Sequence, residues 1–170
     1  MKLAAIYNVF DGVELLEGSM KCLKDHVDLF IIVWQCVSNF GERYDPMEEI
    51  DLSGYPCVFV KYVPEHHAGA YNERKKRNLG IETAKQLNCT HFIQMDCDEY
   101  YTDFGAAKQA YINSGSSGSV CKIFTYFQKP IYRCDVEDGY FVPFIHKLYP
   151  STKTGEGAYP FHVDPTRRIN

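Results

Sequence analysis

The sequence predicts an α/β fold in which helices flank a mainly parallel central sheet. Short apolar segments of strand length alternate along the chain with segments that have helical periodicity. The apolar segments end abruptly in polar residues, as strands buried on both faces do. Alternation of this kind is typical of parallel sheets with helices on their faces.

In the first half of the chain, three apolar runs have the length of buried strands: residues 3–9, 28–35 and 57–63. Between the first two, apolar residues at helical spacing predict a helix over about residues 13–25, with Asp11 and Glu14 as its capping box. The segment between the second and third strands is rich in glycine, proline and acids, so we expect a loop with one helical turn at PMEEI, residues 46–50.

The second half of the chain continues the alternation. A helix is expected from about 71 to 86, with Asn88 as its stop, and the apolar run at 90–95 is the next strand. Asp103 would cap the helix that follows. The last two expected strands are residues 119–127 and 139–149.

Length and composition fit one domain over residues 1–170, since 45% of the residues are apolar and can form a core. The net charge of -4 argues against nucleic acid or an acidic membrane as a partner. No apolar run approaches the ~18 residues of a transmembrane segment, and the first apolar run is broken at Asn8, unlike a secretory signal. Seven cysteines without a C-x-x-C pair are expected as free thiols, so we expect a cytoplasmic protein.

The segment FIQMDCDEYY, residues 92–101, ends an apolar strand with three acids: Asp96, Asp98 and Glu99. In open α/β sheets, ligands gather outside the carboxyl ends of the strands. A hard cation such as Mg²⁺ or Mn²⁺ takes one or two carboxylates there and completes its shell with water and substrate phosphates. The D-x-D pattern therefore predicts a site for a cation and a phosphate ligand.

Two other interpretations apply to these acids. An EF-hand loop starting at Asp96 would need glycine at 101 and glutamate at 107, and the chain has Tyr101 and Ala107 there. That interpretation is excluded. Alternatively, Asp98 or Asp103 only caps the following helix, which would account for one acid and not three.

A run of four cations, residues 74–77, lies in the helix that precedes the acidic strand. Arg74, Arg77 and Asn78 share one side of that helix, and arginine can bind phosphate through two parallel hydrogen bonds. The alternative is a solvated helix face. The run therefore predicts an anion-binding face or a merely exposed one.

The segments AIYNVFDG, VSNFGE, NERKKRNLG and THFIQMDCDEYY together resemble a GT-A fold glycosyltransferase of the family 2 type, over about residues 3–105. The resemblance implies a nucleotide-diphosphate sugar as donor and transfer of the sugar to a hydroxyl of a carbohydrate or lipid-linked acceptor. It also implies that the D-x-D motif holds Mn²⁺ or Mg²⁺. It leaves open whether an acceptor-side extension follows the last residues of the chain.

The resemblance also assigns roles to single residues. Asp98 would bind the metal directly, Asp96 would lie near the ribose or the metal, and His162 could complete the metal shell. The nucleotide sugar would contact Tyr7, Asn8, Gln35, Arg74, Arg77, Asp96 and Cys97. Gln35 stands where the family has an acid, so recognition of the base is expected to differ.

The catalytic base is expected at Glu137 or Asp138, the nearest match to the family's acidic pair. His162 and Asp164 are competing candidates, and a retaining mechanism would need no such base. Two other functions stay open. A nucleotidyltransferase would usually carry a glycine-rich phosphate loop after the first strand, which this chain lacks, and a non-catalytic module would bind the nucleotide sugar without turnover.

Overall fold

A computed structural model describes residues 1–38, 41–48, 50–65, 68–126, 132–134, 141–155 and 157–170. The elements in these residues are, in chain order, β1 (Leu3–Val9), α1 (Val13–Lys21), β2 (Leu29–Trp34), the 3₁₀ turn η1 (Pro46–Glu48), β3 (Cys57–Lys61), α2 (Gly69–Gln86), β4 (His91–Asp96), α3 (Phe104–Ser114), β5 (Gly118–Lys122) and β6 (Phe141–Lys147).

The sheet has six strands in the order β3-β2-β1-β4-β6-β5. The first four run parallel, whereas β6 is antiparallel to both β4 and β5. The prediction of an α/β fold is confirmed, but the sheet is mixed and not mainly parallel. The physical reason is that β5 and β6 follow one another in sequence and pair directly, a connection that favours antiparallel strands.

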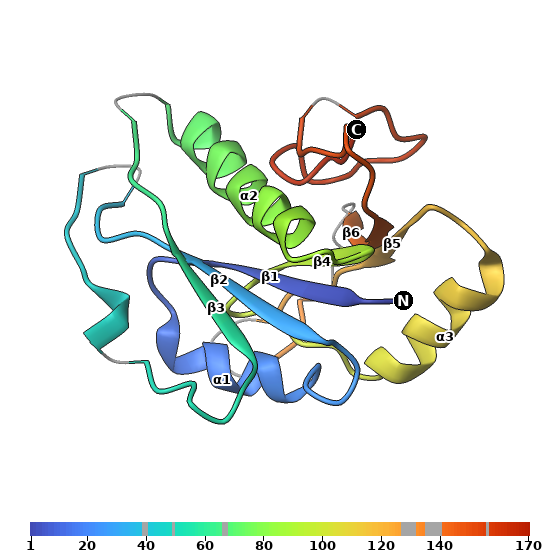
Figure 1. Ribbon diagram of the computed structural model, residues 1–170, viewed down its shortest axis with the longest axis horizontal. Coiled ribbons are helices and arrows are strands. Elements are labelled where there is room, and N and C mark those ends of the chain that lie inside the picture. The colour runs from blue at the N-terminus through green and yellow to red at the C-terminus, as the bar shows by residue number, and fades with distance from the viewer. Residues whose placement is uncertain (39–40, 49, 66–67, 127–131, 135–140, 156) are drawn as a thin grey trace.

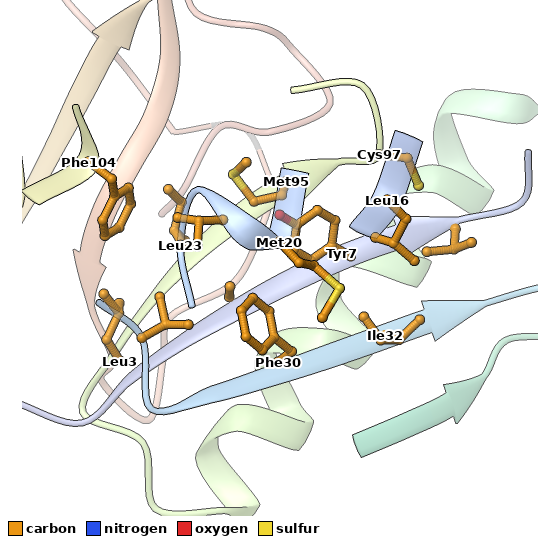
Figure 2. Packing of buried hydrophobic residues seen from close by; sticks show 14 of the residues in the cluster. Leu3, Tyr7, Leu16, Met20, Leu23, Phe30, Ile32, Met95, Cys97 and Phe104 are labelled. Carbon is orange, nitrogen blue, oxygen red and sulfur yellow. The ribbon is translucent and has the colours of Figure 1, made fainter. Parts of the chain in front are cut away.

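Helices cover both faces of the sheet, α2 on one and α1 with α3 on the other (Figure 1). Because side chains alternate along a strand, Leu3, Ala5 and Tyr7 of β1 pack toward α1, as Figure 2 shows for Leu3 and Tyr7. Ala4 and Ile6 face α2 instead. Each large apolar side chain buried in these layers contributes about 1.5–3 kcal/mol. Asn8, the next residue of the α2 series, therefore lies on the α2 side at the strand end.

The helix ends test the local predictions. Asp103 caps α3 as expected, because its Oδ1 accepts a hydrogen bond of 2.9 Å from the Ala106 amide. Asn88 follows α2 with a left-handed φ of 55°, as a stop residue does. The capping box at the first helix is wrong: its N-cap is Gly12 with φ of 68°, and no side chain bonds the helix start. The helix therefore starts one residue later than the capping box requires, after a glycine that tolerates a left-handed φ.

Two contacts show that β1 and the C-terminal segment lie beside α2. At Gly80 the helix approaches β1 so closely that an added Cβ would lie 2.3 Å from the Ile6 Cγ2 atom. Asn78 binds the backbone of Thr154 on both sides, donating from Nδ2 to its oxygen at 3.0 Å and accepting from its amide at 2.6 Å. The C-terminal residues 150–155 and 157–170 therefore lie on the same face of the sheet as α2 (Figure 1).

Among the residues with described positions, no helix is both long and apolar enough to cross a membrane. All seven cysteines of the chain have described positions and are free thiols, as predicted.

Candidate functional site

The strand order places a candidate site between β1 and β4. From β1 the chain moves to β2 on one side, while β4 lies on the other, so the loops after the two strands diverge. In parallel sheets a ligand crevice lies at such a point, outside the carboxyl ends of the strands. The last paired residues of the two strands are Asn8 and Asp96. The predicted acids therefore lie at this edge of the sheet, where β4 ends.

Arg77 joins α2 to the end of β4. It is only 1% exposed, and its Nη2 lies 2.6 Å from Glu73 Oε1 and 3.1 Å from Asp96 Oδ1. With the Asn8 amide oriented so that its oxygen faces the guanidinium, that oxygen accepts from Nε at 3.3 Å and from Nη1 at 3.0 Å. All three nitrogens of Arg77 are thus engaged within the protein. The residue holds Asp96 in place and is not open to a ligand in this arrangement.

Arg167 reaches the same acids from the C-terminal segment. Its Nη1 donates to both carboxylate oxygens of Glu99, at 2.7 and 2.9 Å, and its Nη2 donates to Asp96 Oδ2. Its Nε lies 3.4 Å from Asp164 Oδ2, and the residue is 3% exposed. Glu99 also accepts from the Asp96 amide at 3.0 Å. The ion-pair cluster, as we call this set, consists of Glu73, Arg77, Asp96, Glu99, Asp164 and Arg167.

The pKa values within the ion-pair cluster follow from burial and these contacts. Burial opposes ionisation of Asp96, but Arg77 and Arg167 outweigh it and lower the pKa of that carboxyl below its ordinary value. Burial raises the pKa of Glu99, and Arg167 offsets this only in part. Burial also opposes the charge on Arg167, but the charges of Asp96 and Glu99 outweigh burial and raise its pKa above the ordinary value. The guanidinium therefore stays charged.

Lys76 is a third buried cation beside the ion-pair cluster. Its side chain is 5% exposed, and its Nζ donates to the Val9 carbonyl at the end of β1 at 2.8 Å. Burial, with the neighbouring charge of Arg77, lowers the pKa of Lys76 to about 8. The lysine fixes the end of β1 opposite the acids.

The two outer residues of the Asp96-Cys97-Asp98 segment differ in exposure. Asp98 is exposed, and no described residue forms a hydrogen bond or ion pair with its carboxylate. The Cys97 thiol is buried and lies 3.8 Å from the Asn8 carbonyl oxygen. Burial, followed by the charge of Asp96, raises the pKa of Cys97 to about 12, so the thiol is neutral. Asp98 is therefore the acid of this segment that stays open to a ligand.

A divalent cation does not fit the predicted pair of Asp96 and Asp98 in this arrangement. Both oxygens of Asp96 accept from arginines, which leaves Asp98 as the open carboxylate. Over the described parts of the chain, no three His, Cys, Asp or Glu side chains are arranged to hold a metal. His162 is exposed, and its carbonyl accepts from the Phe141 amide at 2.9 Å. We therefore derive no catalytic step through a metal.

Two residues expected to contact the nucleotide are buried. Tyr7 has no exposed surface, and its hydroxyl lies 2.7 Å from the Ser19 hydroxyl, in the layer that packs on α1. Gln35 is 3% exposed and donates to the Val37 carbonyl at 2.9 Å. Both side chains therefore lie inside the protein, where they support the ends of the strands. Glu137 and Asp138, the expected catalytic acids, lie outside the described residues.

Arg74 lies in a separate depression of about 400 Å³ between α2 and the C-terminal segment. This α2 hollow is lined by Tyr71, Arg74, Lys75, Asn78, Lys153, Thr154, Gly155 and Asn170. Arg74 and Arg77 are thus separated, although their spacing predicts one shared face. Asn78, the third residue of that face, holds the C-terminal segment through Thr154.

Glu73 and Lys76 were not among the predicted site residues, and the pairing of Arg167 with Asp96 was not predicted either. The Glu73–Arg77 pair has the i,i+4 spacing of a helical ion pair, which is a usable signal. Lys76 sits in a run of cations where nothing marks one as buried. Arg167 is 71 residues from Asp96 in the chain, and no local pattern joins them.

No protein-family model matches the chain, and no curated protein matches it either. Among solved structures, a crystal structure of S. aureus TarS 1-349 aligns with a TM-score of 0.50 and 13% identity, over 92% of this chain and 42% of that one. The chain shares its fold with TarS. A second TarS structure aligns with a TM-score of 0.47 and 16% identity, over 71% of this chain and 21% of that one. The chain thus spans less than half of either TarS chain.

Proposed function

We propose that the chain is a glycosyltransferase that moves a sugar from a nucleotide-diphosphate sugar to an acceptor hydroxyl. The observation that carries the proposal is an open carboxylate, Asp98, two residues after a firmly held Asp96 at the carboxyl ends of β1 and β4. The fold shared with TarS, a family 2-like glycosyltransferase, supports the same reaction class. The GT-A assignment belongs to this proposal.

In the proposed reaction, the bond between the anomeric carbon and the diphosphate oxygen breaks, and the nucleoside diphosphate leaves with the electron pair. The acceptor oxygen forms the new bond and gives up its proton to a base. Glu137 or Asp138 remains the predicted base for inversion. A requirement for Mn²⁺ or Mg²⁺ also remains a prediction, and no step here depends on it.

The residue two positions before Asp98 is held in place. Arg77 from α2 and Arg167 from the C-terminal segment hold Asp96, and Lys76 holds the end of β1. Because Asp98 follows a strand end that is already fixed, less of the backbone has to be ordered when the donor binds, which favours binding. We therefore assign donor contact to Asp98 and positioning to Asp96 and Arg77.

The test is a binding panel of nucleoside diphosphates and their sugars, each with and without Mn²⁺, measured by thermal shift and calorimetry. We expect at least one nucleotide sugar to bind and to be slowly hydrolysed. Asp98→Asn should weaken that binding about tenfold or more, the loss of one charge-assisted hydrogen bond. Asp25→Asn is the matched control, because Asp25 is also an exposed aspartate. The proposal fails if no donor binds, or if both variants bind it as the unmodified chain does.

A further inference from the structure

The α2 hollow opens where the C-terminal segment is no longer bonded to α2. Further along the helix, Lys85 Nζ donates to two carbonyls of that segment, at 3.0 and 2.8 Å. Asn78 makes the next contact, through its two hydrogen bonds to Thr154. Arg74 lies about one turn before Asn78, and its side chain bonds to no described residue of the segment. The depression of about 400 Å³ lies at this point.

Three cations line the α2 hollow: Arg74, Lys75 and Lys153. None of them forms an ion pair with a carboxylate in the described part of the chain. Lysines near the ends of α1 and α2 are paired by contrast, Lys21 with Glu17 and Lys85 with Glu82. The chain as a whole has 22 acids against 18 lysines and arginines. The α2 hollow is therefore a locally positive surface on a net-acidic protein, and such a surface attracts anions.

The walls of the α2 hollow are held in place without the three cations. The Asn170 amide donates to the Lys153 carbonyl at 2.9 Å, so the backbone that carries this lysine is fixed. Thr154 is joined to the central sheet as well, because its hydroxyl accepts from Gln94 Nε2 of β4 at 3.0 Å. A ligand would therefore meet a wall that is already formed, and little backbone has to be ordered when it binds.

The lining of the α2 hollow favours an anion with several oxygens. Arginine presents its N–H groups in a planar fork that matches a phosphate group, and each lysine adds a point charge. The Lys75 ammonium lies 5.4 Å from the centre of the Tyr71 ring, which attracts it and limits its freedom. A phosphate monoester carries a charge of roughly -1.5 to -2 near pH 7, which three cations can balance. The volume also falls within the range of about 300–1,000 Å³ that is typical of small-ligand sites.

We propose that the α2 hollow is a second binding site, which takes a phosphate group, either free or carried by a small molecule. Its lining contains none of the residues at the carboxyl ends of β1 and β4, so it is separate from the crevice assigned to the sugar donor. Arg74, which the family resemblance assigns to the donor, belongs to this second site. The inference concerns binding of the anion alone and does not rest on glycosyl transfer.

The first experiment follows the backbone amide signals of the full chain by NMR during a titration with inorganic phosphate at constant ionic strength. The amides of Asn78 and Gly155, which line the α2 hollow, should shift and saturate. The Ala106 amide at the start of α3 is the reference and should not move. Equal shifts with sodium chloride at the same ionic strength, or saturating shifts at Asp98 without any at the hollow, would overturn the proposal.

A parallel titration with glucose 1-phosphate distinguishes the two sources of the phosphate group. Tighter binding of the ester than of inorganic phosphate identifies a site for a phosphorylated small molecule. Tighter binding of inorganic phosphate identifies a site for the free ion. If neither compound shifts the amides of the α2 hollow, the proposal fails.

Variants then test the cations themselves. Arg74→Gln and Lys153→Gln should each weaken binding of the better compound about tenfold, the loss of one charge-assisted hydrogen bond. Both should fold, because neither side chain has an ion pair to lose within the described residues. Lys24→Gln is the matched control: it removes the same charge from an exposed lysine beyond α1, which covers the other face of the sheet. If Lys24→Gln weakens binding as much as Arg74→Gln does, the effect is one of net charge and the site is refuted.

Discussion

The two sides of α2 carry similar residues in opposite circumstances. On the side toward β1 and β4, Arg77 and Lys76 are buried, and each binds a group at a strand end. On the side toward the C-terminal segment, Arg74 and Lys75 line the α2 hollow together with Lys153. No carboxylate in the described part of the chain forms an ion pair with these three.

In α2, the position of a cationic residue, more than its type, determines whether it stabilises the fold or faces solvent. Loss of an inner cation removes a charge-assisted hydrogen bond from Glu73 and Asp96, or one of the hydrogen bonds to the Val9 carbonyl, and such loss is costly. Loss of an outer cation leaves only solvated groups. Stability should therefore depend on the inner side, whereas the outer side is free to meet an anionic ligand.

The largest expected effect separates Arg77 from Arg74. Arg77→Met should lower the free energy of unfolding by about 3–5 kcal/mol, because Glu73 and Asp96 lose a buried partner. Arg74→Met should change it by less than about 0.5 kcal/mol. Urea denaturation of both variants at neutral pH measures the difference. Equal losses would show that the two sides of α2 do not differ as described.

The next effect is the pH dependence of stability at Lys76. Its folded pKa of about 8 lies below the ordinary value of 10.5, so between these values the unfolded chain binds more protons than the folded chain. The cost of burying this charge is present below pH 8 and is relieved as the pH rises toward 10.5. The stability of the unmodified chain should therefore rise relative to Lys76→Met across this window, by up to about 3 kcal/mol.

Denaturation of both proteins at several pH values measures that difference, and other titrating groups cancel in the comparison. A difference that stays flat or falls with pH would mean that Lys76 is not buried as a charge.

The smallest expected effect on stability separates Asp96 from Asp98 within the acidic segment. Asp96→Asn should lower the free energy of unfolding by about 1.5–3 kcal/mol, the range for hydrogen bonds to charged groups. Asp98→Asn should change it by less than about 0.5 kcal/mol, because Asp98 is exposed. Thermal and chemical denaturation of the two variants give both values. A destabilised Asp98→Asn would favour the alternative in which this acid has a structural role.

Much of the parallel part of the fold could be predicted from the sequence. Strands such as β1 and β4 are apolar runs of the right length, and their ends fall within one or two residues of the predicted bounds. The direction of β6 could not be predicted, because one strand pattern fits either orientation. The first capping box failed for a local reason, since the helix starts after Gly12, in a left-handed conformation, and Asp11 is one residue too early to be its N-cap.

The candidate site could be located but not assembled from the sequence. The acids at the end of β4 predicted the correct edge of the sheet, because a place at a strand end is a local property of the sequence. Their pairing is not local: Asp96 meets Arg77 from α2 and Arg167 from the C-terminal segment. Which acid stays open depends on those distant partners, so the roles of Asp96 and Asp98 had to come from the structure.

The close approach at Gly80 has a consequence for the charges nearby. Gly80 lies less than one turn of α2 after Arg77, and no Cβ fits between it and Ile6. A single methyl group at this position would push the helix outward and lengthen the contact between Arg77 and Asp96. An alanine at position 80 would thus weaken the ion pair between Arg77 and Asp96 without adding or removing a charge.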